Sequence, residues 1–250
     1  MYYINKKKGQ IFLKNNIYVK KIINNINCNI NDILIEIGPG KGVLTKKLKL
    51  LTNKFICVEI DKKLVKFLKN NILNKNNKIF NMSILDYKLN FKNKVIIIGN
   101  IPYYITKKIL YWILYNHKKI LYFICLLQKE VANNLLLKDK KISKISIILN
   151  LFFNIKFLLN IKNTNFYPIP KVDSTLLKFI PKFNNININL FLFFIKKIFK
   201  KKRKKIYNSL NLKKYYKYKI FNKRIEELSL KKIVKLYKFL LKNKCLNQDM

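Results

Sequence analysis

The sequence of 250 residues is poor in features that mark metal-binding, disulfide-linked or membrane proteins. Its four cysteines, at 28, 57, 125 and 245, lie far apart and form no Cys-x-x-Cys pair. This spacing argues against a zinc site or a disulfide framework and fits a reducing compartment, so we expect a cytoplasmic protein without a metal. Lysines interrupt each apolar run before it reaches the ~18 residues of a membrane helix. The lysines at 6–8 are followed by no apolar signal segment, and we expect no membrane association.

Acidic side chains are scarce. The sequence has 11 Asp and Glu residues against 54 Lys and Arg residues, which gives a formal net charge of +43 at pH 7. An excess of this size predicts a polyanionic partner, with RNA or DNA first. Arginine occurs only at 203 and 224, and alanine only at 132, whereas Lys, Asn, Ile, Phe and Tyr dominate. Mutation bias in an AT-rich genome produces this composition. Part of the positive charge is therefore explained by that bias and lies on an ordinary solvated surface.

The length allows one large domain, or one of about 150–200 residues with a smaller one. Half of the residues are apolar, which is ample for a core. From about residue 183 the pattern changes to amphipathic helices studded with lysine. We therefore expect one domain over 1–182 and a helical domain over 183–250.

Four consecutive β-branched residues at 95–98 predict a buried parallel strand. Gly99 lets the backbone approach a ligand, and Asn100 follows where the strand meets a loop, the usual ligand crevice of an open α/β sheet. Pro102 fixes its own φ and biases the preceding residue toward an extended shape. We expect the Asn100 amide and the Tyr103 ring to be held rigidly, which suits a planar ring that bears an amine.

A second strand is predicted at 33–37, and the glycines at 38, 40 and 42 follow it. The spacing Gly-x-Gly-x-Gly lets the backbone come close to a ligand at the start of a helix. It differs from the Gly-x-Gly-x-x-Gly of dinucleotide-binding folds.

The strand predicted at 55–61 ends on carboxylates about 20 residues after this turn. An acidic residue at that distance accepts hydrogen bonds from ribose hydroxyls. We assign this role to Glu59 and expect Asp61 to cap the next helix. The glycine turn and the spaced Glu59 together predict an adenosyl cofactor.

Several segments resemble the ribosomal RNA adenine N6-dimethyltransferases. Asn-Ile-Pro-Tyr at 100–103 is similar to the family's Asn-Leu/Ile-Pro-Tyr, and the turn at 38–42 to the first motif of the S-adenosylmethionine-dependent methyltransferases. Phe-Tyr-Pro-Ile-Pro-Lys-Val-Asp-Ser at 166–174 matches the family's Phe-x-Pro-x-Pro-Lys-Val-Asp-Ser almost letter for letter. Further matches are Gly9, Gln10, Phe12 and Leu13, the Gln-Lys-Glu-Val at 128–131, the Asn-Ser-Leu at 208–210, and the Arg-x-Glu-x-Leu-Ser at 224–229.

The resemblance covers about residues 6–240 and implies an α/β fold. It implies a Rossmann-like seven-stranded methyltransferase sheet, mostly parallel, with an antiparallel last strand near 174–180. A small C-terminal helical domain would follow. The implied cofactor is S-adenosyl-L-methionine, and the residues that correspond to its site are Leu13, Gly38, Gly40, Glu59, Ser83 and Asn100.

Four positions depart from the family pattern, and one of them is Ser143, which replaces a Gly. Ile11 replaces an Asn, so any contact made by that side chain is lost while a backbone contact could survive. Ser83 stands where the family has an Asp that accepts from the adenine amine, and Asp86 is a possible substitute three residues on. Lys144 replaces an Arg, which turns a bidentate phosphate contact into a point charge.

The resemblance also implies how the substrate is held. The target adenosine would be turned out of its RNA loop, with Tyr103 and Phe166 as two aromatic plates around the ring. Its amine would donate to the side-chain oxygen of Asn100 and the carbonyl of Pro102. No strong general base is required, because alignment and electrostatics supply the rate.

The partner implied is the rRNA of the small ribosomal subunit, bound by a monomer. A dense basic run would contact its backbone, namely Lys201, Lys202, Arg203, Lys204 and Lys205. Two other functions are compatible with the sequence. One is dimethylation of large-subunit rRNA by the sibling family, which the tail at 224–229 disfavours. The other is a catalytically weak RNA-binding assembly factor, if Ile11 and Ser83 weaken the cofactor pocket.

Overall fold

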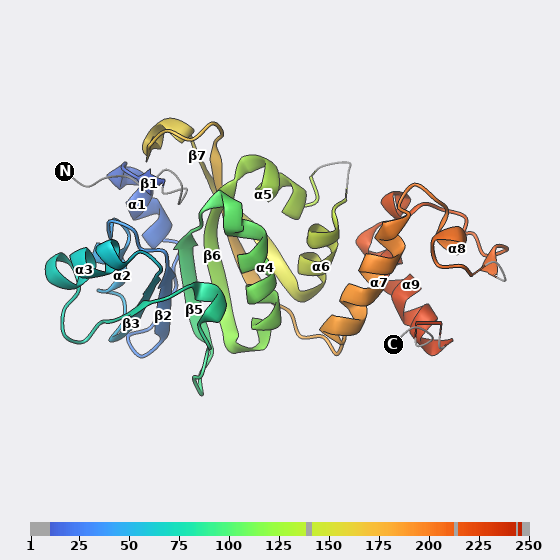
Figure 1. Ribbon diagram of the computed structural model, residues 1–250, viewed down its shortest axis with the longest axis horizontal. Coiled ribbons are helices and arrows are strands. Elements are labelled where there is room, and N and C mark those ends of the chain that lie inside the picture. Colours follow the sequence, from blue (N-terminus) through green and yellow to red (C-terminus); the bar gives the residue numbers. More distant parts are fainter. Residues whose placement is uncertain (1–10, 139–141, 213–214, 244, 247–250) are drawn as a thin grey trace. The chain divides into compact units, whose positions relative to one another are not determined.

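The computed structural model describes residues 11–138, 142–212, 215–243 and 245–246. The lysines at 6–8 and the family matches Gly9 and Gln10 lie outside these ranges. The chain divides into two units (Figure 1). The first contains the described residues up to 136 together with 153–181, and the second contains 137–152 and the chain from 182 onward. The expected boundary at 182/183 lies beside the division at 181/182, and the second unit also includes the earlier helix Lys144–Phe152.

The first unit is built on a seven-stranded sheet with the order β4-β3-β2-β5-β6-β9-β7. Its strands are β2 (Ile33–Ile37), β3 (Lys54–Glu59), β4 (Lys78–Asn81), β5 (Val95–Asn100), β6 (Ile120–Gln128), β7 (Phe153–Ile161) and β9 (Ser174–Pro181). A separate two-stranded sheet pairs β1 (Phe12–Leu13) with β8 (Phe166–Tyr167). The helices of this unit are α1 (Asn16–Ile23), α2 (Thr45–Leu48), α3 (Lys62–Asn71), α4 (Thr106–Tyr115) and α5 (Lys129–Leu135).

Strands β4, β3, β2, β5 and β6 are parallel, and β9 runs antiparallel between β6 and β7. The expected antiparallel strand near 174–180 is thus confirmed. The central strands are buried on both faces, since β2 and β5 consist almost wholly of buried and mainly apolar residues. This is the pattern of a parallel sheet that is covered by helices on both sides.

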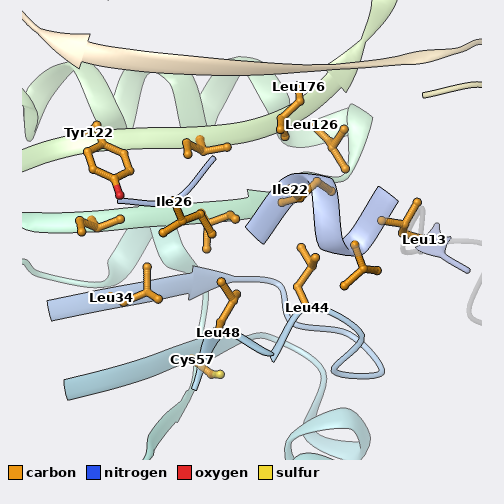
Figure 2. Close-up of a cluster of buried hydrophobic side chains, with 14 of the residues drawn as sticks. Leu13, Ile22, Ile26, Leu34, Leu44, Leu48, Cys57, Tyr122, Leu126 and Leu176 are labelled. Carbon is orange, nitrogen blue, oxygen red and sulfur yellow. The ribbon is translucent and has the colours of Figure 1, made fainter. Parts of the chain in front are cut away.

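Helix α1 covers one face of the sheet. Figure 2 shows Ile22 of this helix and Ile26 just beyond it among buried side chains of the strands, including Leu34 and Leu126. Asn15 begins α1 by accepting a hydrogen bond from the backbone N–H of Ile17, as a helix N-cap does. Helix α4 carries five buried apolar side chains and contacts β6.

The second unit is helical. It contains α6 (Lys144–Phe152), α7 (Ile188–Lys200), the short α8 (Ile206–Ser209) and α9 (Leu230–Lys242). The rings of Phe191 and Phe194 in α7 pack on Tyr237 of α9, with centroids 5.0 and 5.4 Å away. Within the described ranges, no helix is both long enough and apolar enough to cross a membrane.

Candidate active site

A cavity of about 260 Å³ opens in the first unit at the carboxyl ends of β2, β3 and β5. This is where an open α/β sheet binds ligands. Its walls come from the segment before α1, the glycine turn, the ends of three strands and the loop after β5. They include Leu13, Gly38, Gly40, Glu59, Ser83, Asn100, Pro102 and Tyr103. The structure therefore brings together eight of the nine side chains or glycines expected at the active site, and it leaves out Phe166.

The glycine turn adopts a conformation that favours glycine. Gly38, Gly40 and Gly42 have φ of +62°, +58° and +76°. A Cβ on Gly40 would lie 2.7 Å from Cε1 of Phe12, so the turn and β1 approach too closely for a side chain. A Cβ on Gly38 would meet nothing within 4 Å, because this position faces open space. Gly38 therefore leaves room for a ligand, whereas Gly40 makes room for the protein itself.

Glu59 is buried at the end of β3 with its carboxylate bound to two backbone groups. The N–H of Gly40 donates to Oε2 over 3.2 Å, and the N–H of Asp61 donates to Oε1 over 2.9 Å. Burial raises the pKa of Glu59, and these two hydrogen bonds oppose the rise. Asp61 caps α3 by accepting from the N–H of Lys63, as expected. The same carboxylate thus fixes the glycine turn and lines the cavity.

Glu36, in β2 beneath the glycine turn, is a pocket residue that the sequence analysis did not single out. It is 2% exposed, and Thr45 donates a 2.7 Å hydrogen bond to its Oε2. The pKa of Glu36 is raised to about 8, mainly by burial; the Thr45 hydrogen bond opposes this rise and the nearby Glu59 adds to it. A lone acidic residue in an otherwise apolar strand was the available signal.

Asn100 stands at the end of β5, half-buried, with its side chain oriented by the segment before α1. Its Nδ2 donates a 2.8 Å hydrogen bond to the backbone carbonyl of Ile11. This bond uses the donor end of the amide, so the oxygen is the end that a ligand amine can reach. The contact needs only the backbone of Ile11, so it does not depend on the side chain at that position.

Tyr103 begins the short 3-10 turn Tyr103–Ile105 after β5, and its ring lines the cavity. Its hydroxyl lies 2.9 Å from Oγ of Ser174, the first residue of β9. Burial raises the pKa of Tyr103, the Ser174 contact lowers it and Asp173 raises it. The neighbouring Tyr104 also lines the cavity but is 63% exposed. Tyr103 is therefore the ring with a fixed position.

The structure does not support the expected role of the Pro102 carbonyl. This carbonyl accepts from the N–H of Ile105 over 3.2 Å and from Oγ1 of Thr106 over 3.4 Å. It closes the turn that starts α4 and is directed toward that turn. Pro102 itself lines the cavity, so its contribution is a stiff backbone between Asn100 and Tyr103.

Phe166 is also placed differently from expectation. It is 1% exposed and belongs to the core cluster that contains Leu13. The pairing of β1 with β8 sets this position, because Leu13 lies opposite Phe166 and Phe12 lies opposite Tyr167. Alternation along the strand then turns Phe166 inward and leaves Tyr167 57% exposed. Phe166 is a core residue that supports β1.

Ser83 lines the cavity, and its Oγ accepts a 3.2 Å hydrogen bond from the N–H of Leu85. The side chain thus caps the 3-10 turn Ile84–Asp86, while its hydroxyl proton remains a donor. Asp86 is exposed and is not among the residues that line the cavity. The structure therefore gives no support to Asp86 as a substitute for the family's Asp. Apolar side chains that the sequence analysis missed, including Ile60 and Met82, complete this wall.

The basic run lies in the second unit, in the turn that follows α7. All five side chains from Lys201 to Lys205 are exposed. Lys202 forms an ion pair of 3.2 Å with Glu226, and the hydroxyl of the buried Ser209 lies 3.0 Å from the carbonyl of Lys201. The turn is therefore ordered by its own backbone and by one acidic neighbour. Across the residues that the structure describes, no group of three or more His, Cys, Asp or Glu side chains could hold a metal.

The chain was compared with known families and proteins. The family model "Ribosomal RNA adenine dimethylase" matches residues 1–242. The ribosomal RNA small subunit methyltransferase A of Mycoplasma mobile is 40% identical over 215 residues, which are 84% of each chain. The protein of the same name from Metamycoplasma arthritidis is 37% identical over 253 residues, covering 96% of this chain and 97% of that one.

Solved structures show the same fold. The dimethyladenosine transferase from Plasmodium falciparum superposes with a TM-score of 0.80 at 25% identity, over 93% of this chain and 98% of that one. The 23S rRNA methyltransferase ErmE superposes with a TM-score of 0.72 at 20% identity, over 95% and 100% of the two chains.

Proposed function

The chain belongs to the ribosomal RNA adenine dimethylase family, and we propose that it methylates the small-subunit rRNA during ribosome biogenesis. The reaction transfers methyl groups from S-adenosyl-L-methionine to the N6 amines of adenosines. The targets are two adjacent adenosines, each dimethylated, in a loop near the 3′ end of this rRNA. The two relatives described above, both named small subunit methyltransferase A and matched over 84% and 97% of their own length, support this choice. The partner is the small ribosomal subunit, and the place of action is the cytoplasm, where a monomer suffices.

The pocket fits the cofactor in three respects. Open space beside Gly38 leaves room for a ligand against the turn. Glu59 offers a buried carboxylate to ribose hydroxyls. Apolar side chains and the Ser83 hydroxyl form a wall suited to an adenine ring. The residues that would hold the cofactor are Leu13, Gly38, Gly40, Glu59, Ser83 and Asn100. Bound S-adenosyl-L-methionine supplies an electrophilic methyl group.

Asn100 carries the proposal for the chemistry. An exocyclic adenine amine is a poor nucleophile because its lone pair is shared with the ring. A hydrogen bond from the amine to the Asn100 oxygen draws that lone pair back to the nitrogen, and the bond to Ile11 holds the amide in place for it. Tyr103 stacks on one face of the base, an interaction worth roughly 1–3 kcal/mol. The amine loses its proton to solvent after the transfer, so no strong base is needed.

A methyl-transfer assay tests the proposal. Labelled S-adenosyl-L-methionine would be mixed with unmethylated small ribosomal subunits and, in parallel, with large subunits. The products would be read as modified nucleosides. We expect dimethyladenosine in small-subunit RNA alone. Label found only in large-subunit RNA would assign this chain the activity of the sibling family, dimethylation of large-subunit rRNA. Absence of label in both, with subunit binding intact, would favour an assembly factor.

The assembly-factor function has one observation in its favour. Ser83 replaces an acidic acceptor and already accepts a hydrogen bond within its own turn. Titration calorimetry with S-adenosyl-L-methionine separates the two functions, because an enzyme must bind the cofactor and an assembly factor need not. Heat of binding that Glu59→Ala abolishes would reject the assembly-factor function.

A further inference from the structure

The second unit contains an exposed tyrosine that is held in place by other aromatic rings. Tyr218 is 55% exposed, yet its ring centroid lies 6.0 Å from that of Tyr215, 6.4 Å from Phe221 and 6.0 Å from Phe239. These three rings also pack on one another, with Tyr215 stacked on Phe221 at 5.2 Å. Three aromatic neighbours thus hold the Tyr218 ring in place, while roughly half of the residue's surface faces solvent.

Lysines interleave with this aromatic surface. Lys217 and Lys219 flank Tyr218 and are exposed, and Tyr216 beside them is 53% exposed. An aromatic ring that is held by its neighbours, half exposed and flanked by cations has the two parts of a single-stranded nucleic-acid site. The ring accepts any base by stacking, and the cations follow the phosphates.

Backbone hydrogen bonds tie this surface to the basic run at 201–205. The N–H of Ile206, which directly follows the run, donates to the carbonyl of Lys223 over 2.9 Å. The N–H of Tyr207 donates to the carbonyl of Phe221 over 3.1 Å. The chain therefore places the end of the basic run next to the segment that carries Tyr218.

We propose that Tyr218 is a stacking platform for an unpaired RNA base, with the phosphates beside that base bound by the lysines of 201–205, 217 and 219. This inference rests on the proposed action on RNA and adds a second contact in the helical unit. It explains why a ring stabilised by three neighbours leaves half of its surface open. A ring that served only to fill a core would be covered on both faces, as Phe221 is, with 1% exposed.

Crosslinking of the full-length protein tests the placement. The probe is a single-stranded RNA of about ten nucleotides in which 5-iodouracil replaces the uracils, since this base crosslinks to aromatic rings that stack on it. Mass spectrometry of the digested adduct should find the crosslink on Tyr218. A crosslink confined to other tyrosines would overturn the proposal.

Binding measurements on variants test how much stacking on Tyr218 contributes to the affinity for single-stranded RNA. Tyr218→Leu keeps apolar packing against Phe221 and Phe239 but removes the stacking ring, and we expect it to weaken single-strand binding by about tenfold. Tyr218→Phe keeps the ring and should bind within about twofold of the unaltered protein. The matched control is Tyr115→Leu, because Tyr115 is also 55% exposed but lies at the end of α4 in the first unit. Circular dichroism melting confirms that each variant is folded.

Three results would overturn the inference. Tyr218→Leu could bind as tightly as the unaltered protein, or Tyr218→Phe could lose as much as Tyr218→Leu. Alternatively, Tyr218→Leu could weaken binding to whole small subunits while leaving single-stranded RNA binding intact, which would assign the platform to a ribosomal protein. The methyl-transfer assay above keeps the two proposals apart. If the protein methylates small subunits but Tyr218→Leu leaves its binding to single-stranded RNA unchanged, this inference is rejected and the proposed function stands.

Discussion

The side-chain amide of Asn100 donates its hydrogen bond to the backbone carbonyl of Ile11, 89 positions earlier in the chain and 2.8 Å away. Ile11 and Asn100 both line the cavity. The segment before α1 therefore closes one side of the pocket and also fixes the orientation of its main polar group. This link makes the amide rigid before any substrate arrives, which is how preorganised dipoles contribute to a reaction rate.

Asn100→Ala should lower the rate of methyl transfer by about a hundredfold or more, as the loss of one preorganised polar group typically does. Asn100→Asp should also be slow, because a carboxylate cannot donate to the Ile11 carbonyl and is repelled by it. RNA binding should change by less than about twofold. Single-turnover methyl transfer and fluorescence anisotropy measure the two effects. If methyl transfer and RNA binding fell by equal factors, Asn100 would have no specific role in the chemical step.

The strands around the pocket could be predicted because their signals are local. The β-branched run at 95–98 and the apolar run at 33–37 are strands at those positions. The role of Asp61 as a cap follows from its place at the start of a helix, and the structure confirms it. The antiparallel order at β9 came from family resemblance, since one segment's pattern does not fix the direction of its neighbours.

The remaining features depend on pairing between distant segments. Phe166 is turned into the core by the two-residue ladder with β1, and the sequence of neither strand specifies that register. The helix Lys144–Phe152 groups with the C-terminal helices although it is separated from them by β7 and β9. The Pro102 carbonyl is used by a turn whose hydrogen bonds appear only when α4 is placed.

Glu36→Gln should change how stability depends on pH. The pKa of Glu36 is about 8 in the folded protein against an ordinary 4.5, so between these values the native state binds more protons than the unfolded state. Stability then falls as pH rises through this window and levels off above the folded pKa. Glutamine has no proton to lose and can still accept from Thr45. Melting temperatures from about pH 5 to 9 should therefore decline less for the variant.

The control for this titration is Glu130→Gln, since Glu130 is exposed in the first turn of α5. Its profile should parallel that of the unaltered protein. If Glu36→Gln showed the same decline as the control, the carboxyl of Glu36 would not be the group that carries the pH dependence.

The two glycines of the turn should respond differently to alanine. Both have positive φ, which costs a side chain roughly 1–2 kcal/mol. Gly40→Ala also forces its methyl into the ring of Phe12, so it should lower the melting temperature more than Gly38→Ala. Gly38→Ala places a methyl in the open space of the pocket and should mainly weaken cofactor binding. Thermal melts and calorimetry decide this, and a reversed order of the two melting temperatures would contradict the packing argument.

Two lysines of the basic run should contribute unequally to RNA binding. Lys202 is paired with Glu226 at 3.2 Å, whereas Lys204 is exposed and forms no ion pair with any residue that the structure describes. Each phosphate contact adds about 0.7 to the salt slope of single-strand binding. Lys204→Gln should therefore reduce the slope by about this amount, and Lys202→Gln by less. Binding titrations over a series of salt concentrations test the order, which equal slopes for both variants would disprove.

The contact between Tyr103 and Ser174 should be measurable as a coupling energy. Ser174 is 1% exposed at the start of β9, so a change to Tyr103→Phe leaves its hydroxyl without this partner. Ser174→Ala removes the same hydrogen bond from the other side. Each single variant should be destabilised, while the double variant should lose less than the sum, by about 1 kcal/mol.

The same cycle separates stacking from positioning. Tyr103→Phe keeps a ring that can stack, so it should retain RNA affinity and lose rate only through a looser position. Ser174→Ala should reproduce that loss of rate without changing the ring, because the Ser174 hydroxyl contacts the Tyr103 hydroxyl. Chemical denaturation gives the coupling in stability, and single-turnover transfer gives the coupling in rate. Additive effects in both measurements would mean that the 2.9 Å contact holds neither the fold nor the ring.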